Sequence, residues 1–111
     1  MLVDSAFNGV VSDVTAKGFE FVYHIVNYID GGYLYYMVME AGENQPTMED
    51  VRKGNSNLCV GSLAQNMHVN EINVFCSLTV GMRYKLWIVI DMNIRGTLGS
   101  MFVIEMETCN N

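Results

Sequence analysis

The sequence predicts an all-β domain built from two stacked sheets. Short apolar runs separated by turn residues recur along the chain, without internal repeats or low-complexity tracts. Several runs alternate apolar and polar residues, which is typical of a strand with one buried face. We expect one domain over residues 1–111, with its core at about 8–107. About seven strands and one small helix make a two-layer sandwich the economical architecture.

The composition excludes several classes of protein. Hydrophobic residues make up 50% of the chain and charged residues 16%, which is too apolar for a disordered segment. The apolar runs are too short to span a bilayer as a helix, and no signal-peptide pattern follows Met1. With a net charge of −6 and only 6 Lys and Arg residues, nucleic acids and anionic membranes are poor partners.

The first half of the chain predicts three strands. We expect strands at Asn8–Thr15 and Phe19–Val26, joined by a turn at Ala16–Gly18. In the second strand, alternation places four residues on one face: Phe19, Phe21, Tyr23 and Ile25. Asp30–Gly32 is a strong turn signal, and Tyr33–Met39 is apolar on both faces, which predicts a central strand.

A short helix is predicted at about residues 47–54, after the third strand. Thr47 can cap the helix, and Asp50 occupies the position of the reciprocal acidic partner. Acidic residues lie in the first turn and basic residues in the last, as the helix dipole favours. Gly54 supplies the C-terminal stop.

The second half predicts four more strands. They are an edge strand at Leu58–Leu63, then Val69–Leu78, Tyr84–Asp91 and, after a turn at Asn93–Gly96, Thr97–Met106. Alternation predicts the residues that face the core: Ile72, Val74, Cys76 and Leu78; Tyr84, Leu86, Ile88 and Ile90; Phe102, Ile104 and Met106.

One motif in this half points to a family. Leu78, Gly81 and Tyr84 have the spacing Leu-x-x-Gly-x-x-Tyr. The run 78–91 resembles the end of strand E, the E–F corner and strand F of a fibronectin type III domain. The resemblance implies that Leu78 lies in the core and Gly81 at the corner, and that the Tyr84 hydroxyl bonds back to nearby backbone.

The resemblance extends over most of the chain. The run 32–39 and the block 45–54 are similar to a subgroup of these domains in which a short helix follows strand C. That subgroup occurs as repeats in large multi-domain surface or secreted proteins. The resemblance therefore implies a seven-stranded fibronectin type III or immunoglobulin-like sandwich. It also implies a non-catalytic spacer or adhesion module of a larger extracellular or cell-surface protein, whose partners are neighbouring domains or another protein.

The residues with catalytic potential do not form a recognisable constellation. His24 and His68 lie on different predicted elements, and there is no nucleophile elbow, P-loop or HExxH motif. Asp91-Met92-Asn93 supplies too few oxygens for a calcium site. We therefore expect no enzymatic activity, no catalytic residue, no cofactor and no metal.

The three cysteines leave two interpretations open. Cys59 and Cys76 can form a disulfide with Cys109 left over, or all three can be free thiols. A Cys59–Cys76 bridge indicates an oxidising compartment, whereas free thiols keep an intracellular scaffold open.

The outer face of one sheet is the predicted contact surface. If Leu86, Ile88 and Ile90 point inward, period two places Trp87 and Val89 outward. Six residues then become interface candidates: Tyr33, Tyr35, Met37, Trp87, Val89 and Val103. Aromatic and Met side chains of this kind favour protein contacts.

Two alternatives to an interface with a partner stay open for this face. The chain itself can cover the apolar side chains, through the stems of Arg83 and Lys85 or through a neighbouring domain. The face can also bind carbohydrate, with the rings of Tyr35 and Trp87 as a stacking platform beside Lys85 and Glu105.

Overall fold

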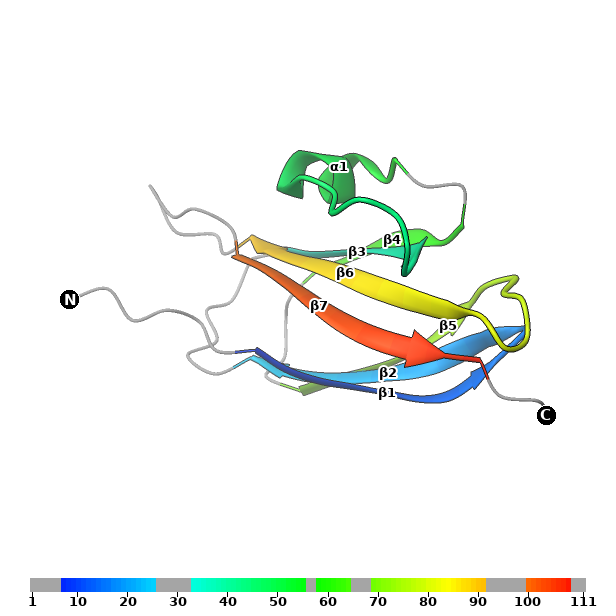
Figure 1. Ribbon diagram of the computed structural model, residues 1–111. Coiled ribbons are helices and arrows are strands. Elements are labelled where there is room, and N and C mark those ends of the chain that lie inside the picture. Colours follow the sequence, from blue (N-terminus) through cyan, green and yellow to red (C-terminus); the bar gives the residue numbers. More distant parts are fainter. Residues whose placement is uncertain (1–6, 26–32, 56–57, 65–68, 92–99, 109–111) are drawn as a thin grey trace.

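The computed structural model describes residues 7–25, 33–55, 58–64, 69–91 and 100–108. They form seven strands in two antiparallel sheets, with one short helix outside the larger sheet (Figure 1). The smaller sheet has the order β1-β2-β5, formed by β1 (Phe7–Thr15), β2 (Gly18–Ile25) and β5 (Val69–Phe75). The larger sheet has the order β4-β3-β6-β7, formed by β4 (Val60–Ala64), β3 (Tyr33–Glu40), β6 (Arg83–Asp91) and β7 (Ser100–Glu107). The predicted all-β sandwich is confirmed at this level.

The core lies between the two sheets and is built by alternate residues of both. Phe21 of β2, Leu34 of β3 and Leu86 of β6 are completely buried there. The predicted inward positions are confirmed wherever the structure describes their side chains, which leaves out Ile25. Removal of this apolar surface from water is the main force that holds the two layers together.

The strand positions in the sheets follow the apolar patterns. The doubly apolar β3 is a central strand with β4 and β6 on its two sides, as predicted, and β4 is an edge strand. The strand predicted at Val69–Leu78 is too long, because β5 ends at Phe75. Beyond Phe75, the Cys76 and Leu78 N–H groups donate to carbonyls of the β1–β2 turn instead of to a strand. The predicted turns at residues 30–32 and 93–96 lie outside the described residues.

The helix α1 (Met48–Lys53) confirms the helix predicted between the third and fourth strands. The Thr47 side chain accepts a hydrogen bond from the Asp50 N–H at 3.1 Å, and the Asp50 carboxylate accepts one from the Thr47 N–H at 3.0 Å. Gly54 ends the helix in the left-handed conformation, with φ of 72°. This reciprocal capping satisfies N–H groups that a helix leaves without partners at its start.

The sandwich is closed along both sides, and the chain enters and leaves it at opposite ends. A disulfide joins Cys59, just before the edge strand β4, to Cys76, just after the edge strand β5. On the other side, β1 contacts β7. Figure 1 shows that β1 begins at one end of the sandwich and β7 finishes at the other.

Candidate functional site

The predicted contact surface is the outer face of the larger sheet. The register places Met37 beside Trp87, and Trp87 beside Val103, in one row across β3, β6 and β7. The next row contains Tyr35, Val89 and Met101. These side chains point away from the core between the sheets, as period two requires.

Three of the six interface candidates are buried, because α1 covers the centre of this face. Met37 and Val89 are completely buried, and Trp87 is only 7% exposed. Together with Val51 of α1 they form a second apolar cluster outside the sheet. Because α1 contacts both β3 and β6, the chain buries these candidates itself, with the helix as the cover and not the Arg83 and Lys85 stems or a neighbouring domain that the sequence suggested.

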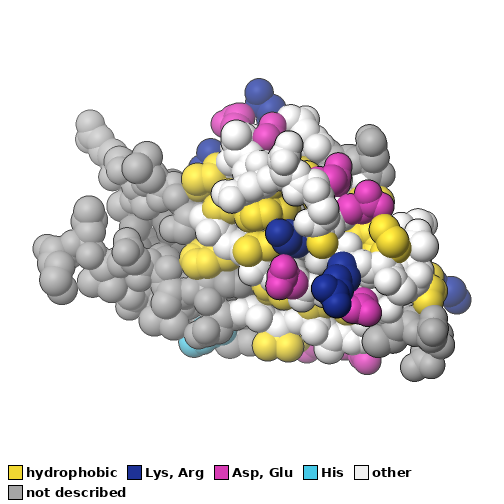
Figure 2. Space-filling view, in the orientation of Figure 1, with side chains coloured by type: hydrophobic (Ala, Val, Ile, Leu, Met, Phe, Trp, Pro, Cys, Tyr) yellow, Lys and Arg dark blue, Asp and Glu magenta, His cyan; other side chains and the backbone are white. Residues whose placement is uncertain are grey.

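Three of the six interface candidates keep exposed surface around α1. Tyr33 is 51% exposed, Val103 is 43% exposed, and Tyr35 is half-buried with its ring stacked on that of Tyr33 at 6.3 Å. Figure 2 shows hydrophobic side chains on the face of β6 and β7 beside α1, next to basic and acidic groups. Arg83 of β6 and Glu107 of β7 form an ion pair at 3.4 Å.

The carbohydrate platform predicted from Tyr35 and Trp87 does not form. A sugar ring stacks on an aromatic face that is open to solvent, and Trp87 is buried under α1. Lys85 of β6 and Glu105 of β7 are paired in the register, and they are the two residues suggested as polar partners for sugar hydroxyls. Of the two rings predicted to stack on a sugar, only the half-buried Tyr35 ring keeps surface in solvent.

The corner motif builds a compact hydrogen-bonded unit at the end where β7 finishes. The Thr79 N–H donates to the Tyr84 hydroxyl at 2.8 Å, and both Leu78 and Tyr84 are buried. Gly81 has φ of 82°, a conformation that side chains disfavour. Thr108, just past β7, donates from its hydroxyl to the Thr79 carbonyl at 2.6 Å. The corner therefore holds the exit of β7 in a fixed place.

The two cysteines that the sequence suggested as a possible disulfide are paired. Cys59 and Cys76 form a disulfide with a Cα–Cα distance of 5.7 Å, which lies within the range for unforced bridges. Cys109 lies outside the described residues. Disulfides persist in oxidising compartments, so this bridge is consistent with such a compartment, including the extracellular space.

The structure describes only some of the ionisable residues that were candidates for catalysis or metal binding. His24 is exposed on β2, and His68 lies outside the described residues. Met92 and Asn93, from the run considered as a calcium site, also lie outside them. Within the described ranges, no three His, Cys, Asp or Glu side chains are grouped so that they could hold a metal ion. No described helix is long and apolar enough to cross a membrane.

No protein-family model matches the chain, and no curated protein matches its sequence.

The outer face of the smaller sheet carries exposed groups that lie outside the predicted contact surface. Phe75 is 86% exposed and Val10 is 66% exposed. The register places Glu71 in the same row as Val10, and Glu20 diagonal to Phe75. The sequence contained a signal for the exposure of Phe75, because the alternation that buries Val74 and Cys76 turns Phe75 outward. What the sequence could not show is which residues of β1 and β2 lie next to Phe75.

Proposed function

We propose that this chain is a non-catalytic spacer module of the fibronectin type III kind, belonging to a larger extracellular or cell-surface protein. In this proposal β3, β6 and β7 correspond to strands C, F and G, and β5 corresponds to strand E. The proposal is supported by the neighbouring order β3-β6-β7 and by the corner between β5 and β6, where Thr79 N–H bonds to the Tyr84 hydroxyl.

The observation that carries the proposal is the opposite placement of the two ends. A spacer holds its neighbours apart, so its chain should enter at one pole and leave at the other. β1 begins at one pole and β7 finishes at the other (Figure 1), and hydrogen bonds between Thr108 and the corner fix the exit. The disulfide favours the extracellular location over the intracellular scaffold.

In this proposal, the interface candidates that remain exposed contact a neighbouring domain or another protein. Tyr33, Tyr35 and Val103 lie beside the covered cluster and keep apolar surface in solvent. A neighbouring domain or another protein could pack there without displacing α1.

Pulling on the two termini of single molecules tests the spacer function. We expect a distinct force peak when the sandwich unfolds, because tension is applied between opposite poles. Under oxidising conditions the segment between Cys59 and Cys76, separated by 17 residues, stays locked. Reduction should then add about 60 Å of extended chain, at about 3.5 Å per residue. If the molecule extends without a force peak, the proposal that it acts as a spacer under tension is contradicted.

A further inference from the structure

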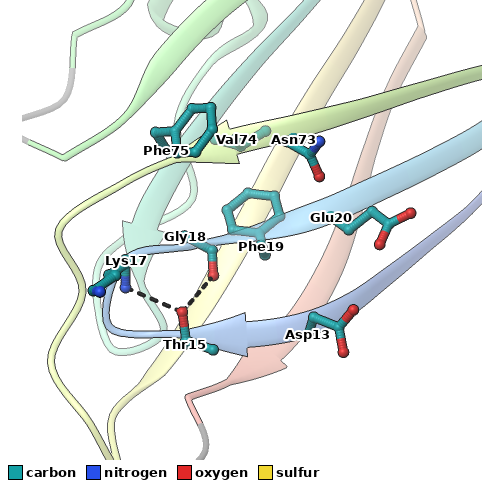
Figure 3. A pocket seen from close by; sticks show the side chains of 9 residues that line it. All are labelled: Asp13, Thr15, Lys17, Gly18, Phe19, Glu20, Asn73, Val74 and Phe75. Atoms are coloured by element: carbon teal, nitrogen blue, oxygen red, sulfur yellow. Dashed lines mark hydrogen bonds between the residues drawn. The ribbon is translucent and has the colours of Figure 1, made fainter. Parts of the chain in front are cut away.

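A hollow of about 290 Å³ lies on the outer side of the smaller sheet, near the β1–β2 turn. It is open to solvent and does not belong to the predicted contact surface, which is on the other sheet. Figure 3 shows the residues around it, from β1, the turn, β2 and β5: Asp13, Thr15, Lys17, Gly18, Phe19, Glu20, Asn73, Val74 and Phe75.

Phe75 forms one wall of this groove and is unusually open for an aromatic residue. Its partner across the sheet is Gly18, which has no side chain to cover the ring. The ring is 86% exposed, so both faces are accessible to another molecule. An aromatic ring attracts a cation above its face, and most strongly one that also has a flat or apolar part to stack.

Carboxylates lie at the other end of the groove. Asp13 lies at the irregularity in β1 where the register shifts, with φ of 52°, and Glu20 of β2 pairs with Asn73 of β5. Glu20 is therefore diagonal to Phe75 on one side and to Glu71 on the other. Figure 3 places Asp13, Glu20 and Asn73 together, away from Phe75 and Lys17.

These carboxyl groups lack a compensating cation in the described part of the chain. A hydrogen bond with Glu71, the charge of Glu71 and the charge of Asp13 all raise the pKa of the exposed Glu20 carboxyl. Lys17, at the rim, does not offset this effect, and no described residue forms an ion pair with Glu20. A positive group from outside would relieve the repulsion.

We propose that this groove binds an arginine side chain presented by another polypeptide. The arginine stem can pack along the Phe75 ring while its planar guanidinium group, at the other end of the groove, donates paired hydrogen bonds to Glu20 and Asp13. A lysine has a compact ammonium group and cannot do both equally well. This inference does not depend on the fibronectin-like assignment, so either can fail without the other.

A second copy of this chain is the less suitable partner. The net charge of −6 opposes association of two copies. Both described arginine side chains already have partners: Arg83 pairs with Glu107, and Arg52 pairs with Glu49. The complementary surface is therefore a different polypeptide that carries exposed arginine.

The test is an NMR titration of the oxidised chain with acetyl-Gly-Arg-Arg-Gly-amide at neutral pH. The matched probes replace both arginines with citrulline, which has the same shape without the charge, or with lysine. We expect shifts centred on the amides of Gly18, Phe19, Asn73 and Phe75. Glu20→Gln and Phe75→Ala should each weaken binding roughly three- to fivefold, the range for exposed ion pairs and cation–π contacts.

Control variants remove a carboxylate and an exposed apolar side chain from the other sheet. Glu105→Gln and Val103→Ala alter exposed side chains on β7 and should leave the affinity unchanged. Because Glu20 and Phe75 are both on the surface, either variant alone keeps the test decisive if the other fails to fold. Equal binding of the citrulline or lysine peptide, shifts outside the groove only, or full affinity in Glu20→Gln would overturn the proposal.

Discussion

Single residues at the corner show how one hydroxyl group organises a turn. The Tyr84 ring is buried in the core, while its hydroxyl accepts the Thr79 N–H at 2.8 Å. Thr79 in turn receives a hydrogen bond from Thr108 at its carbonyl. The ring thus anchors the corner to the core, and the corner anchors the end of β7.

Tyr84→Phe tests the hydroxyl without removing the ring. The variant leaves the Thr79 N–H without its acceptor, so we expect the free energy of unfolding to fall by about 1–2 kcal/mol. Urea unfolding, followed by far-UV circular dichroism, measures the change. Tyr33→Phe, at a half-exposed ring, is the control and should change stability little. Equal losses in the two variants would show that the corner bond contributes nothing specific.

Gly18 is a second position where a single residue matters. Its φ of 140° disfavours side chains, and a Cβ there would collide with the Val74 carbonyl oxygen. Gly18→Ala should destabilise the fold by about 2 kcal/mol or more, since the strained backbone and the clash add. Gly42→Ala is the control, because no atom lies within 4 Å of its added Cβ. Similar melting temperatures for the two variants would contradict this account.

At the scale of one element, α1 illustrates local determination of structure. Its six residues are too few for a stable isolated helix, so the capping box and the packing of Val51 on the sheet must hold it. Asp50 is central to the box. Hydrogen bonds from the Thr47 N–H, from the Asn55 side chain and from the Thr47 hydroxyl lower the pKa of its carboxyl below the ordinary value of 3.8.

The lowered pKa of Asp50 predicts an acid-dependent loss of stability. Ionised Asp50 stabilises the folded state fully above pH 3.8, and this contribution is lost as the pH falls through the lower pKa of the folded protein. Asp50→Asn should therefore melt at a lower temperature than the parent at about pH 6, and the difference should shrink below about pH 4. Melting curves over this pH range test it. A difference that is independent of pH would exclude the titration of Asp50 as its cause.

At the scale of the whole molecule, the disulfide joins the two layers at their edges. Cys59 precedes β4 of the larger sheet and Cys76 follows β5 of the smaller sheet. The bridge therefore closes one side of the sandwich, while β1 and β7 contact each other on the opposite side. The bridge also restricts the unfolded chain, because it keeps the ends of one loop together and so lowers the conformational entropy of the unfolded state.

Removal of the bridge should lower the stability of the whole domain. For a separation of 17 residues, the loss of loop-closure entropy amounts to about 3 kcal/mol. We expect this difference between the oxidised and reduced forms of a Cys109→Ser variant, in which no third thiol can exchange. Denaturant unfolding with and without a reductant measures it. Coincident unfolding curves would show that packing between the sheets already supplies this stability.

Much of the fold could be predicted because its signals are local. Alternation placed Phe21, Leu86 and Ile88 in the core, and the spacing of Thr47, Asp50 and Gly54 marked the helix, because each pattern depends on neighbours in the sequence. The end of β5 was misplaced, since hydrogen bonds to a distant turn decided it.

The candidate sites depended on contacts between distant residues, so the sequence alone could not settle them. Period two by itself determined that Trp87 and Met37 point out of the sheet. Only the tertiary structure decided that α1 lies on them, because the pattern in a strand specifies which side a residue faces but not what covers that side. For the same reason the groove beside Phe75 emerged only when the register set Gly18 opposite it.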